Sequence, residues 1–286
     1  MGNTRCQLLQ AHKAAHVGLE ATDPLPPDAI SVCGVSYSYT KKPFVEDFNL
    51  DIPRGKITSI VGPNGCGKST LLKIIDGLIV PHKGKVLIDG RPSLAMGGKE
   101  RARHLALLAQ GARPPAMSVE ALVACGRYPY QGHMHRRLDR KDKEHIEEAM
   151  VLAKVEQFRH QDVRYLSGGE RQRAFIAMTL AQDTGIIALD EPTSYLDVRA
   201  CHEIMQLVRE LNSASNKTIV MVIHDLDLAL RYSDYIVVME RGNCIHKGGA
   251  SDTDTVKAIE TAFQVEICPF PSDERIAYAL FPFADK

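Results

Sequence analysis

A glycine-rich stretch, Gly62–Thr70, concentrates residue types that are suited to phosphate chemistry. It fits the pattern G-x-x-x-x-G-K-[ST], in which main-chain N–H groups turn inward to bind an anion. The Lys68 ammonium adds a charge for the β- and γ-phosphates, and the Ser69 hydroxyl is a hard oxygen ligand suited to Mg²⁺. The stretch consists of Gly62, Pro63, Asn64, Gly65, Cys66, Gly67, Lys68, Ser69 and Thr70. It predicts a binding site for the phosphates of a nucleotide.

The segments on either side of this loop have the character that the motif requires. Residues 57–61 are mostly apolar and β-branched, which is typical of a buried strand, and residues 71–75 are typical of the first turns of a helix. The motif requires a strand, a glycine loop and a helix in this order, so the interpretation as a chance glycine-rich turn is disfavoured.

Further polar side chains follow other predicted strands. The strands cover residues 105–109, 186–189 and 218–223, and they are followed by Gln110, by Asp190 and Glu191, and by His224. Strands that alternate with helices predict a mostly parallel sheet covered by helices on both faces. Ligands of such sheets bind at the carboxyl ends of the strands, so we expect these groups to converge on one nucleotide.

Each of these groups suggests a role. Asp190 is placed to hold the water shell of Mg²⁺ rather than to cap its strand. Glu191, the next residue, points another way and can activate a water beyond the γ-phosphate as a general base. Gln110 can orient water or bind Mg²⁺, and His224 can donate a hydrogen bond to a γ-phosphate oxygen. Taken alone, Gln110 is a weak signal because glutamine ends many strands, and a strand-end histidine such as His224 is more often a structural residue.

A second anion nest is predicted at Ser167, Gly168 and Gly169. Ser167 has the features of a helix N-cap, and Glu170 three residues later completes a capping box. A nest at a helix start binds anions, and a chain that already has one phosphate loop can use it for the nucleotide of another subunit. An ordinary helix cap explains the same residues equally well.

The predicted fold class is α/β, with a mostly parallel core sheet, an antiparallel β subdomain and an inserted α-helical subdomain at about residues 111–167. Residues 1–29 are polar and proline-rich and are expected to form a flexible tail. The pattern also predicts antiparallel strands over 35–39 and 48–52, helices over 118–126, 139–158, 168–183 and 198–214, strands at 235–239 and 243–246, and a weak helix with possible strands beyond 250.

Composition restricts the class of protein. Lys plus Arg equals Asp plus Glu, 35 against 35, which argues against nucleic acid as the main partner. The seven cysteines form no C-x-x-C pair and suit free thiols in a reducing compartment. Alkylation of the loop residue Cys66 is expected to block nucleotide binding. His133 and His135 are too few for a structural metal site.

Targeting signals are not evident in the sequence. No apolar run reaches the length of a membrane-spanning helix. The first residues lack the apolar core of a signal peptide, so secretion is not expected. Myristoylation at Gly2 is also not expected, because Cys6 stands where the signal has Ser or Thr.

Several motifs in a fixed order identify a family. They are Gly62–Thr70, Gln110, Leu166–Glu170, Ile186–Glu191, Ser194–Asp197 and His224. Over about residues 30–270 the chain resembles the ATP-binding subunits of ABC transporters, which have the P-loop NTPase (RecA-like) fold. Phosphate-loop kinases and GTPases share only the first motif and part of the fourth. A nucleotide kinase would therefore leave Leu166–Glu170 unexplained.

The resemblance implies a homodimer that sandwiches two ATP molecules with Mg²⁺. Each ATP would meet the phosphate loop of one chain and Ser167, Gly168 and Gly169 of the other. Tyr39 would stack on adenine, Thr70 would contact the α-phosphate, and Asp197 would couple the two sites. Closure on ATP and opening after hydrolysis would drive two transmembrane permease subunits, served by an extracytoplasmic substrate-binding protein. The chain would then lie peripherally on the cytoplasmic face of the membrane.

The particular residues within the motifs indicate one branch of the family. Residues 62–72, 126–129, 174–178, 192–197 and 224–226 resemble the ATPases of ferric-siderophore, haem and vitamin B12 importers. Iron-siderophore uptake is the first choice, and haem, vitamin B12 or another substrate are the alternatives. A soluble, non-transport ABC ATPase is less favoured, because such chains usually carry two cassettes or long coiled-coil inserts. Two residues depart from the pattern of the family: Glu170 replaces the usual Gln, and Tyr195 replaces a small residue. The sequence assigns no role to the segment 271–286.

Overall fold

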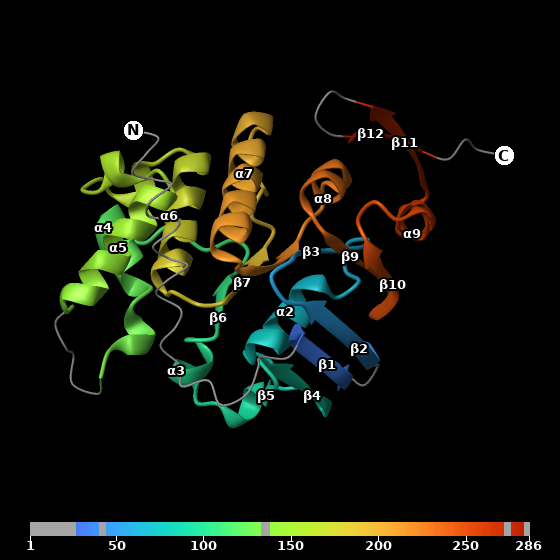
Figure 1. Ribbon diagram of the computed structural model, residues 1–286, viewed down its shortest axis with the longest axis horizontal. Coiled ribbons are helices and arrows are strands. Elements are labelled where there is room, and N and C mark those ends of the chain that lie inside the picture. The colour runs from blue at the N-terminus through green and yellow to red at the C-terminus, as the bar shows by residue number, and fades with distance from the viewer. Residues whose placement is uncertain (1–26, 40–43, 133–137, 272–275, 283–286) are drawn as a thin grey trace. The chain divides into compact units, whose positions relative to one another are not determined.

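The computed structural model describes residues 27–39, 44–132, 138–271 and 276–282 (Figure 1). These residues divide into two compact units. The phosphate-loop unit holds the described residues up to Ala95 and from Thr218 onward, and the helical unit holds Met96–Lys217. Residues 1–26 of the predicted tail lie outside the described residues. So do His133 and His135, which we predicted to be too few for a structural metal site. The first strand begins at Asp28, inside the predicted tail.

A parallel core runs through the phosphate-loop unit. Strand β3 (Ile57–Val61) lies between β8 (Thr218–Val222) and β9 (Tyr235–Glu240) and is parallel to both. Strand β10 (Asn243–Gly249) pairs with β9 in the antiparallel sense. Every residue of β3 and β8 is buried, as their mostly apolar, β-branched character predicts for strands covered on both faces.

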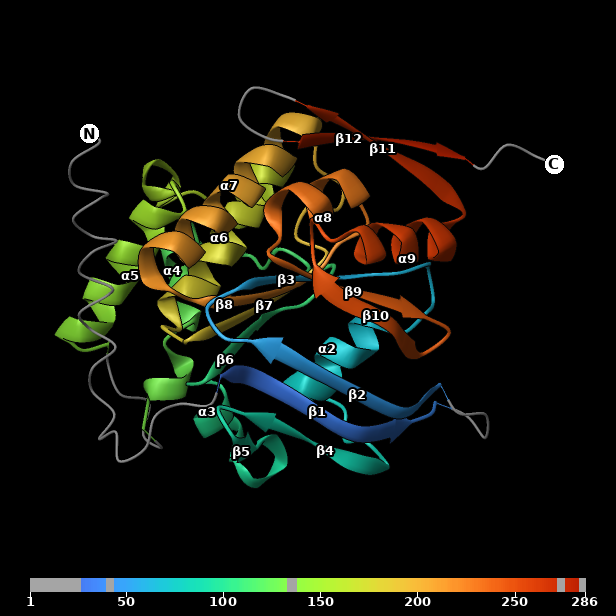
Figure 2. The same cartoon turned by 45° about the vertical axis from the view of Figure 1, so that its right-hand side comes forward.

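The predicted antiparallel strands form a separate sheet in the same unit, shown in Figure 2. Its order is β2-β1-β4-β5, with β1 at Asp28–Tyr37, β2 at Val45–Pro53, β4 at Lys83–Ile88 and β5 at Arg91–Pro92. From Phe48 onward, buried residues of β2 alternate with exposed ones. This period of two confirms the prediction of strands with one wet face.

Helices and one hairpin complete the phosphate-loop unit. They are α2 (Lys68–Asp76), the 3₁₀ turn η1 (Ser93–Ala95), α8 (Leu226–Tyr232), α9 (Thr253–Phe263) and the antiparallel pair β11 (Val265–Pro271) and β12 (Ile276–Pro282). The weak helix predicted beyond residue 250 is therefore α9. The predicted boundary at residue 271 falls within the hairpin, because β11 and β12 pair across it.

The helical unit combines two parallel strands with a group of helices. The strands are β6 (Leu105–Leu108) and β7 (Ile186–Asp190). The helices are α3 (Gly98–Arg101), α4 (Val119–Cys125), α5 (Arg140–Leu152), α6 (Gly168–Ala181) and α7 (Val198–Ser215), with 3₁₀ turns η2 (Tyr128–Tyr130), η3 (Glu156–Phe158) and η4 (Val163–Tyr165). Helices α4, α5 and α6 lie side by side (Figure 1). No helix among the described residues is long and apolar enough to cross a membrane.

One predicted helix is too long. The expected helix over 139–158 is α5, which ends at Leu152. Lys154 takes a left-handed backbone conformation with φ 58°, which stops the helix before the short turn η3 begins. Ala153 and Val155 are buried after the end of α5, so the apolar pattern continues past the last helical residue.

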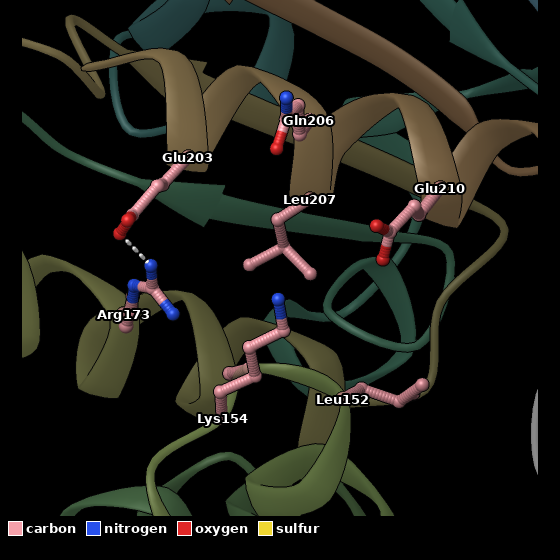
Figure 3. Close-up of a pocket in the computed structure, with 8 residues that line it drawn as sticks. Leu152, Lys154, Arg173, Glu203, Gln206, Leu207 and Glu210 are labelled. Atoms are coloured by element: carbon pink, nitrogen blue, oxygen red, sulfur yellow. Dashed lines mark hydrogen bonds and ion pairs between the residues drawn. The ribbon is translucent and has the colours of Figure 1, made fainter. Parts of the chain in front are cut away.

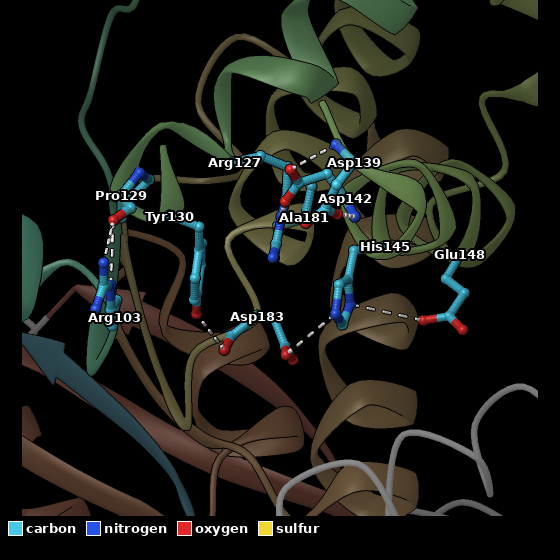
Figure 4. A network of polar contacts seen from close by, with 10 residues as sticks. All are labelled: Arg103, Arg127, Pro129, Tyr130, Asp139, Asp142, His145, Glu148, Ala181 and Asp183. Atoms are coloured by element: carbon cyan, nitrogen blue, oxygen red, sulfur yellow. Dashed lines mark hydrogen bonds and ion pairs between the residues drawn. The ribbon is translucent and has the colours of Figure 1, made fainter. Parts of the chain in front are cut away.

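A buried arginine joins three helices of this unit (Figure 4). Arg127, after the end of α4, donates through Nε to Asp142 Oδ1 of α5 at 2.9 Å and through Nη1 to the Ala181 carbonyl of α6 at 2.7 Å. Its guanidinium also lies over the Tyr130 ring, 4.0 Å from the centroid. Arg127 is only 4% exposed, so its charge is compensated inside the protein by these contacts.

Candidate nucleotide-binding site

The phosphate loop of the phosphate-loop unit connects β3 to α2 as predicted. Gly62 has a φ of 158°, and a Cβ there would lie 2.2 Å from the carbonyl oxygen of Met239. Only glycine therefore fits this position. Gly67 is the N-cap of α2 and has no side chain, so the first-turn N–H groups are not capped by their own N-cap residue. A helix start of this kind is suited to bind phosphate.

The Lys68 side chain is buried beneath the loop and 5% exposed. Its ammonium donates to the carbonyl oxygens of Gly62 at 2.7 Å and Pro63 at 3.1 Å. Ser69, next to it in the first turn of α2, is half-buried. The loop thus holds a cation and a hydroxyl at the start of one helix, as its sequence predicts.

The structure brings together two further predicted residues of this unit. The Tyr39 hydroxyl and Thr70 Oγ1 are 3.0 Å apart. The Tyr39 ring packs edge-on against Tyr37 and Phe44, with centroids 5.0 and 5.5 Å away, and Tyr39 is still 58% exposed. An exposed aromatic ring tied to the loop is suited to stack on a base.

His224 is exposed just after β8. The next residue, Asp225, caps α8 by accepting a hydrogen bond from the Leu228 N–H at 3.1 Å. His224 therefore stands at the carboxyl end of a parallel strand, where the sequence predicts it.

In the helical unit, the predicted general base has two side-chain partners. Glu191 Oε2 accepts hydrogen bonds from the Gln110 side-chain amide and from Ser194 Oγ, the latter at 2.6 Å. The Glu191 backbone is in the left-handed region, with φ 54°. This conformation is unfavourable for a residue with a Cβ and is often found at functional sites. Asp190, before it, is 3% exposed at the end of β7.

Ser194 is the functional candidate that sequence reasoning missed. The pattern places it in a motif three residues after Glu191, but only the turn of the chain aims its hydroxyl at that carboxylate. The three-residue spacing from Glu191 to Ser194 could have indicated a turn at this point. In the structure, the Ser194 N–H donates to the Glu191 carbonyl oxygen at 3.2 Å and closes that turn.

We expect Ser194→Ala to lower kcat about tenfold, because a hydrogen bond to a charged group contributes about 1.5–3 kcal/mol. Steady-state ATP hydrolysis measures the effect. Ser194→Thr keeps the hydroxyl and should keep most of the rate. Full turnover by Ser194→Ala would contradict the positioning role of this serine.

The helix start at the predicted second nest has the expected cap. Ser167 is the N-cap of α6: its Oγ accepts from the Glu170 N–H at 3.4 Å, and Glu170 Oε2 accepts from the Ser167 N–H at 2.9 Å. The capping box is therefore confirmed. Asp197 caps α7 through the Ala200 N–H at 2.8 Å. A pocket of about 530 Å³ is lined by both loops, including Ser167, Gly168, Gly169, Tyr195 and Asp197.

The loop cysteine is less accessible than its position suggests. Cys66 is 5% exposed, and burial raises the pKa of its thiol more than the nearby Lys68 ammonium lowers it. Alkylation needs the thiolate, so we expect Cys66 to react at least about tenfold more slowly at pH 7 than the exposed Cys125, and faster as the pH rises. Peptide mapping after timed labelling measures both rates. ATP affinity that is unchanged after full labelling of Cys66 would contradict the predicted block.

The chain is similar to known proteins over most of its length. The family described as ABC transporter matches residues 45–194. The petrobactin import ATP-binding protein FpuD of Bacillus anthracis is 42% identical over 86% of this chain and 89% of its own. The iron(3+)-hydroxamate import ATP-binding protein FhuC of Bacillus subtilis is 39% identical over 84% and 89%.

A solved structure agrees with this assignment. The dimeric bacterial ABC transporter cassette MJ0796 is 29% identical, with a TM-score of 0.67 over 78% of this chain and 99% of that one. The phosphate loop, the carboxylate pair after β7 and the capped nest at Ser167 are thus found in a protein of the matching fold. The chain belongs to the ABC transporter family, as an ATP-binding and ATP-hydrolysing subunit of an importer.

Proposed function

We propose that this subunit energises uptake of an iron-siderophore-type metal chelate through a pair of membrane permease subunits. The observation that carries the substrate class is the similarity, over more than four-fifths of the chain, to relatives named for petrobactin and iron-hydroxamate import. Two subunits act together on two ATP molecules at the cytoplasmic face of the membrane. An extracytoplasmic binding protein delivers the chelate to the permease, and nucleic acid has no part in the cycle.

The phosphate loop binds the triphosphate of ATP. Lys68 exchanges its hydrogen bonds with the Gly62 and Pro63 carbonyls for bonds with phosphate oxygens, and the N–H groups of Gly62–Thr70 surround the β-phosphate. Thr70 contacts the α-phosphate and Tyr39 stacks on adenine. The hydrogen bond between Tyr39 and Thr70 supports this pairing, because it links the base-binding ring to the first turn of α2.

Glu191 removes a proton from the water that attacks the γ-phosphate. Its carboxylate is oriented by the Ser194 hydroxyl and by Gln110, which orients the water in turn. His224 donates a hydrogen bond to a γ-phosphate oxygen. The left-handed backbone at Glu191 supports this assignment, because such strain persists where a side chain must be aimed.

Mg²⁺ fits the donors that this chain offers. Ser69, Asp190 and Gln110 supply hydroxyl, carboxylate and amide oxygens, the hard ligands that Mg²⁺ prefers. When bound, the ion neutralises charge on the phosphates. Asp190 is only 3% exposed, and a buried carboxylate of this kind is stabilised by a cation.

The second nest serves the nucleotide of the partner subunit. Ser167, Gly168 and Gly169 offer N–H groups at the start of α6, and Asp197 lies at the start of α7 beside the same pocket. In a sandwich dimer, these groups meet the γ-phosphate held by the other chain, which makes hydrolysis depend on dimer closure.

Transport in whole cells tests the substrate class. The chain would be expressed with a candidate permease pair and binding protein from the same genome, and uptake of radiolabelled ferric siderophore, haem and vitamin B12 would be compared. We expect siderophore uptake that is lost with Glu191→Gln. Uptake of haem or vitamin B12 alone would overturn the substrate class, and ATP hydrolysis that no permease pair stimulates would overturn the transport role.

A further inference from the structure

The two loops that line the 530 Å³ pocket start two helices that pack closely at their first turns. A Cβ at Gly169 of α6 would lie 3.2 Å from the Ala200 Cβ of α7, and one at Gly168 would lie 3.4 Å from Leu196 Cδ2. The first turns of α6 and α7 are therefore in contact, with little room for any added side chain. A change in the angle between the two helices would move both loops.

An ion pair joins the same two helices farther along (Figure 3). Arg173 of α6 donates through Nη2 to Glu203 Oε2 of α7, and Arg199 of α7 donates through Nε to Glu203 Oε1 at 3.0 Å. Both carboxylate oxygens of Glu203 are thus bound by arginines from two helices. Hydrogen bonds from Arg199, and the charge of Arg173, hold the pKa of Glu203 below its ordinary value, so Glu203 is ionised at neutral pH.

The position of this ion pair is informative. Arg173 is four residues after Gly169, and Glu203 is six residues after Asp197. At 1.5 Å per residue, the pair lies about 6 Å and about 9 Å along the helices from the two loops. Beyond it, α7 faces a pocket of about 260 Å³ lined by Leu152, Lys154, Leu207 and Glu210 (Figure 3). The ion pair therefore links α6 to α7 at the edge of a pocket, where side-chain packing alone would not fix the spacing of the two helices.

We propose that the Arg173–Glu203 ion pair is a positioning contact that fixes the spacing between the Ser167–Gly169 nest and Asp197. Both residues also line the 530 Å³ pocket, but each is already engaged by the other, so we assign them to positioning the loops. The pair makes the two loops of one subunit a single preformed surface for the partner's ATP, which lowers the cost of ordering them on closure. This inference rests on the proposed sandwich of two subunits.

A dissection of binding steps tests the role. In a full-length Glu191→Gln background, ATP-driven dimerisation would be measured by sedimentation, and ATP binding by single chains would be measured at subunit concentrations below the dimerisation range. Arg173→Gln and Glu203→Gln should raise the dimer Kd about tenfold, a coupling typical of residues in one ion-pair network. ATP affinity of the single chain should stay within about twofold, because the phosphate loop is untouched.

Three further variants complete the test. Arg173→Lys keeps the charge and should dimerise within about threefold of the parent, because a lysine ammonium can also donate to the Glu203 carboxylate. The double variant of Arg173→Gln and Glu203→Gln should be no worse than either single change, since it removes the same pair. Glu144→Gln, which breaks an exposed ion pair with Arg140 on α5, is the matched control and should dimerise normally.

The outcomes separate this inference from the proposed function. Parent-like dimerisation by both Gln variants would overturn the inference, and so would an equal loss of single-chain ATP binding. If a Gln variant fails to fold, dimerisation by Arg173→Lys that is more than about threefold weaker than the parent's overturns it. A parent chain that binds ATP but never dimerises would instead overturn the proposed sandwich, before any variant is compared.

Discussion

Glu191→Gln should reduce kcat for ATP hydrolysis by about 10²- to 10⁴-fold, the usual contribution of a positioned general base. The amide has the shape of the carboxylate but cannot take a proton from the attacking water. It can still accept the hydrogen bond that Ser194 donates at 2.6 Å, so the turn after β7 should persist. Steady-state phosphate release with the permease complex measures the loss.

Binding should survive this change. The Lys68 ammonium and the loop amides are unaffected, so ATP affinity should stay within about twofold and the ATP-bound dimer should accumulate. Glu144→Gln makes the same chemical change on an exposed face of α5 and should keep the full rate. A Glu191→Gln subunit that hydrolyses ATP at the parent rate would show that another group accepts the proton.

Arg127→Met should destabilise the helical unit by about 3–5 kcal/mol, the cost of removing one partner of a buried ion pair. The change leaves the mostly buried Asp142 carboxylate and the Ala181 carbonyl without the cation that binds both. It also removes the guanidinium that lies over the Tyr130 ring. Urea unfolding followed by circular dichroism measures the loss of free energy.

A matched change identifies burial as the cause. Arg140→Met removes an arginine from an ion pair with Glu144 whose side chains are 93% and 55% exposed, and it should cost less than about 0.5 kcal/mol. Equal destabilisation by the two substitutions would contradict the account. The double variant of Arg127→Met and Asp142→Asn should recover part of the loss, because it no longer buries an uncompensated carboxylate.

Local patterns were sufficient for the elements and for the motifs they carry. The β-branched run before Gly62 predicted β3, and the run at 71–75 predicted α2, which begins three residues earlier at Lys68. The spacing of Ser167 and Glu170 predicted a capping box that the structure contains. These features depend on residues within a few positions of one another, so the sequence specifies them directly.

Contacts between segments that are distant in the sequence could not be predicted in this way. The end of α5 at Leu152 depends on a left-handed residue that its apolar period does not reveal. The contact between Gln110 and Glu191 joins residues 81 positions apart, and the Arg173–Glu203 pair joins residues 30 positions apart. The strand-end positions of Gln110 and Glu191 indicated site residues but not their direct contact, and nothing in the local sequence of Arg173 and Glu203 distinguishes them from solvated residues.

The sequence by itself therefore determined the family, the phosphate-binding loop and the types of the groups that follow the strands. Only the tertiary structure decided which of these groups touch: Ser194 with Glu191, Tyr39 with Thr70, and α6 with α7 through one carboxylate. The physical reason is that a motif records main-chain geometry over a few residues. The direction in which a side chain points depends on how helices and strands that are distant in the sequence pack together.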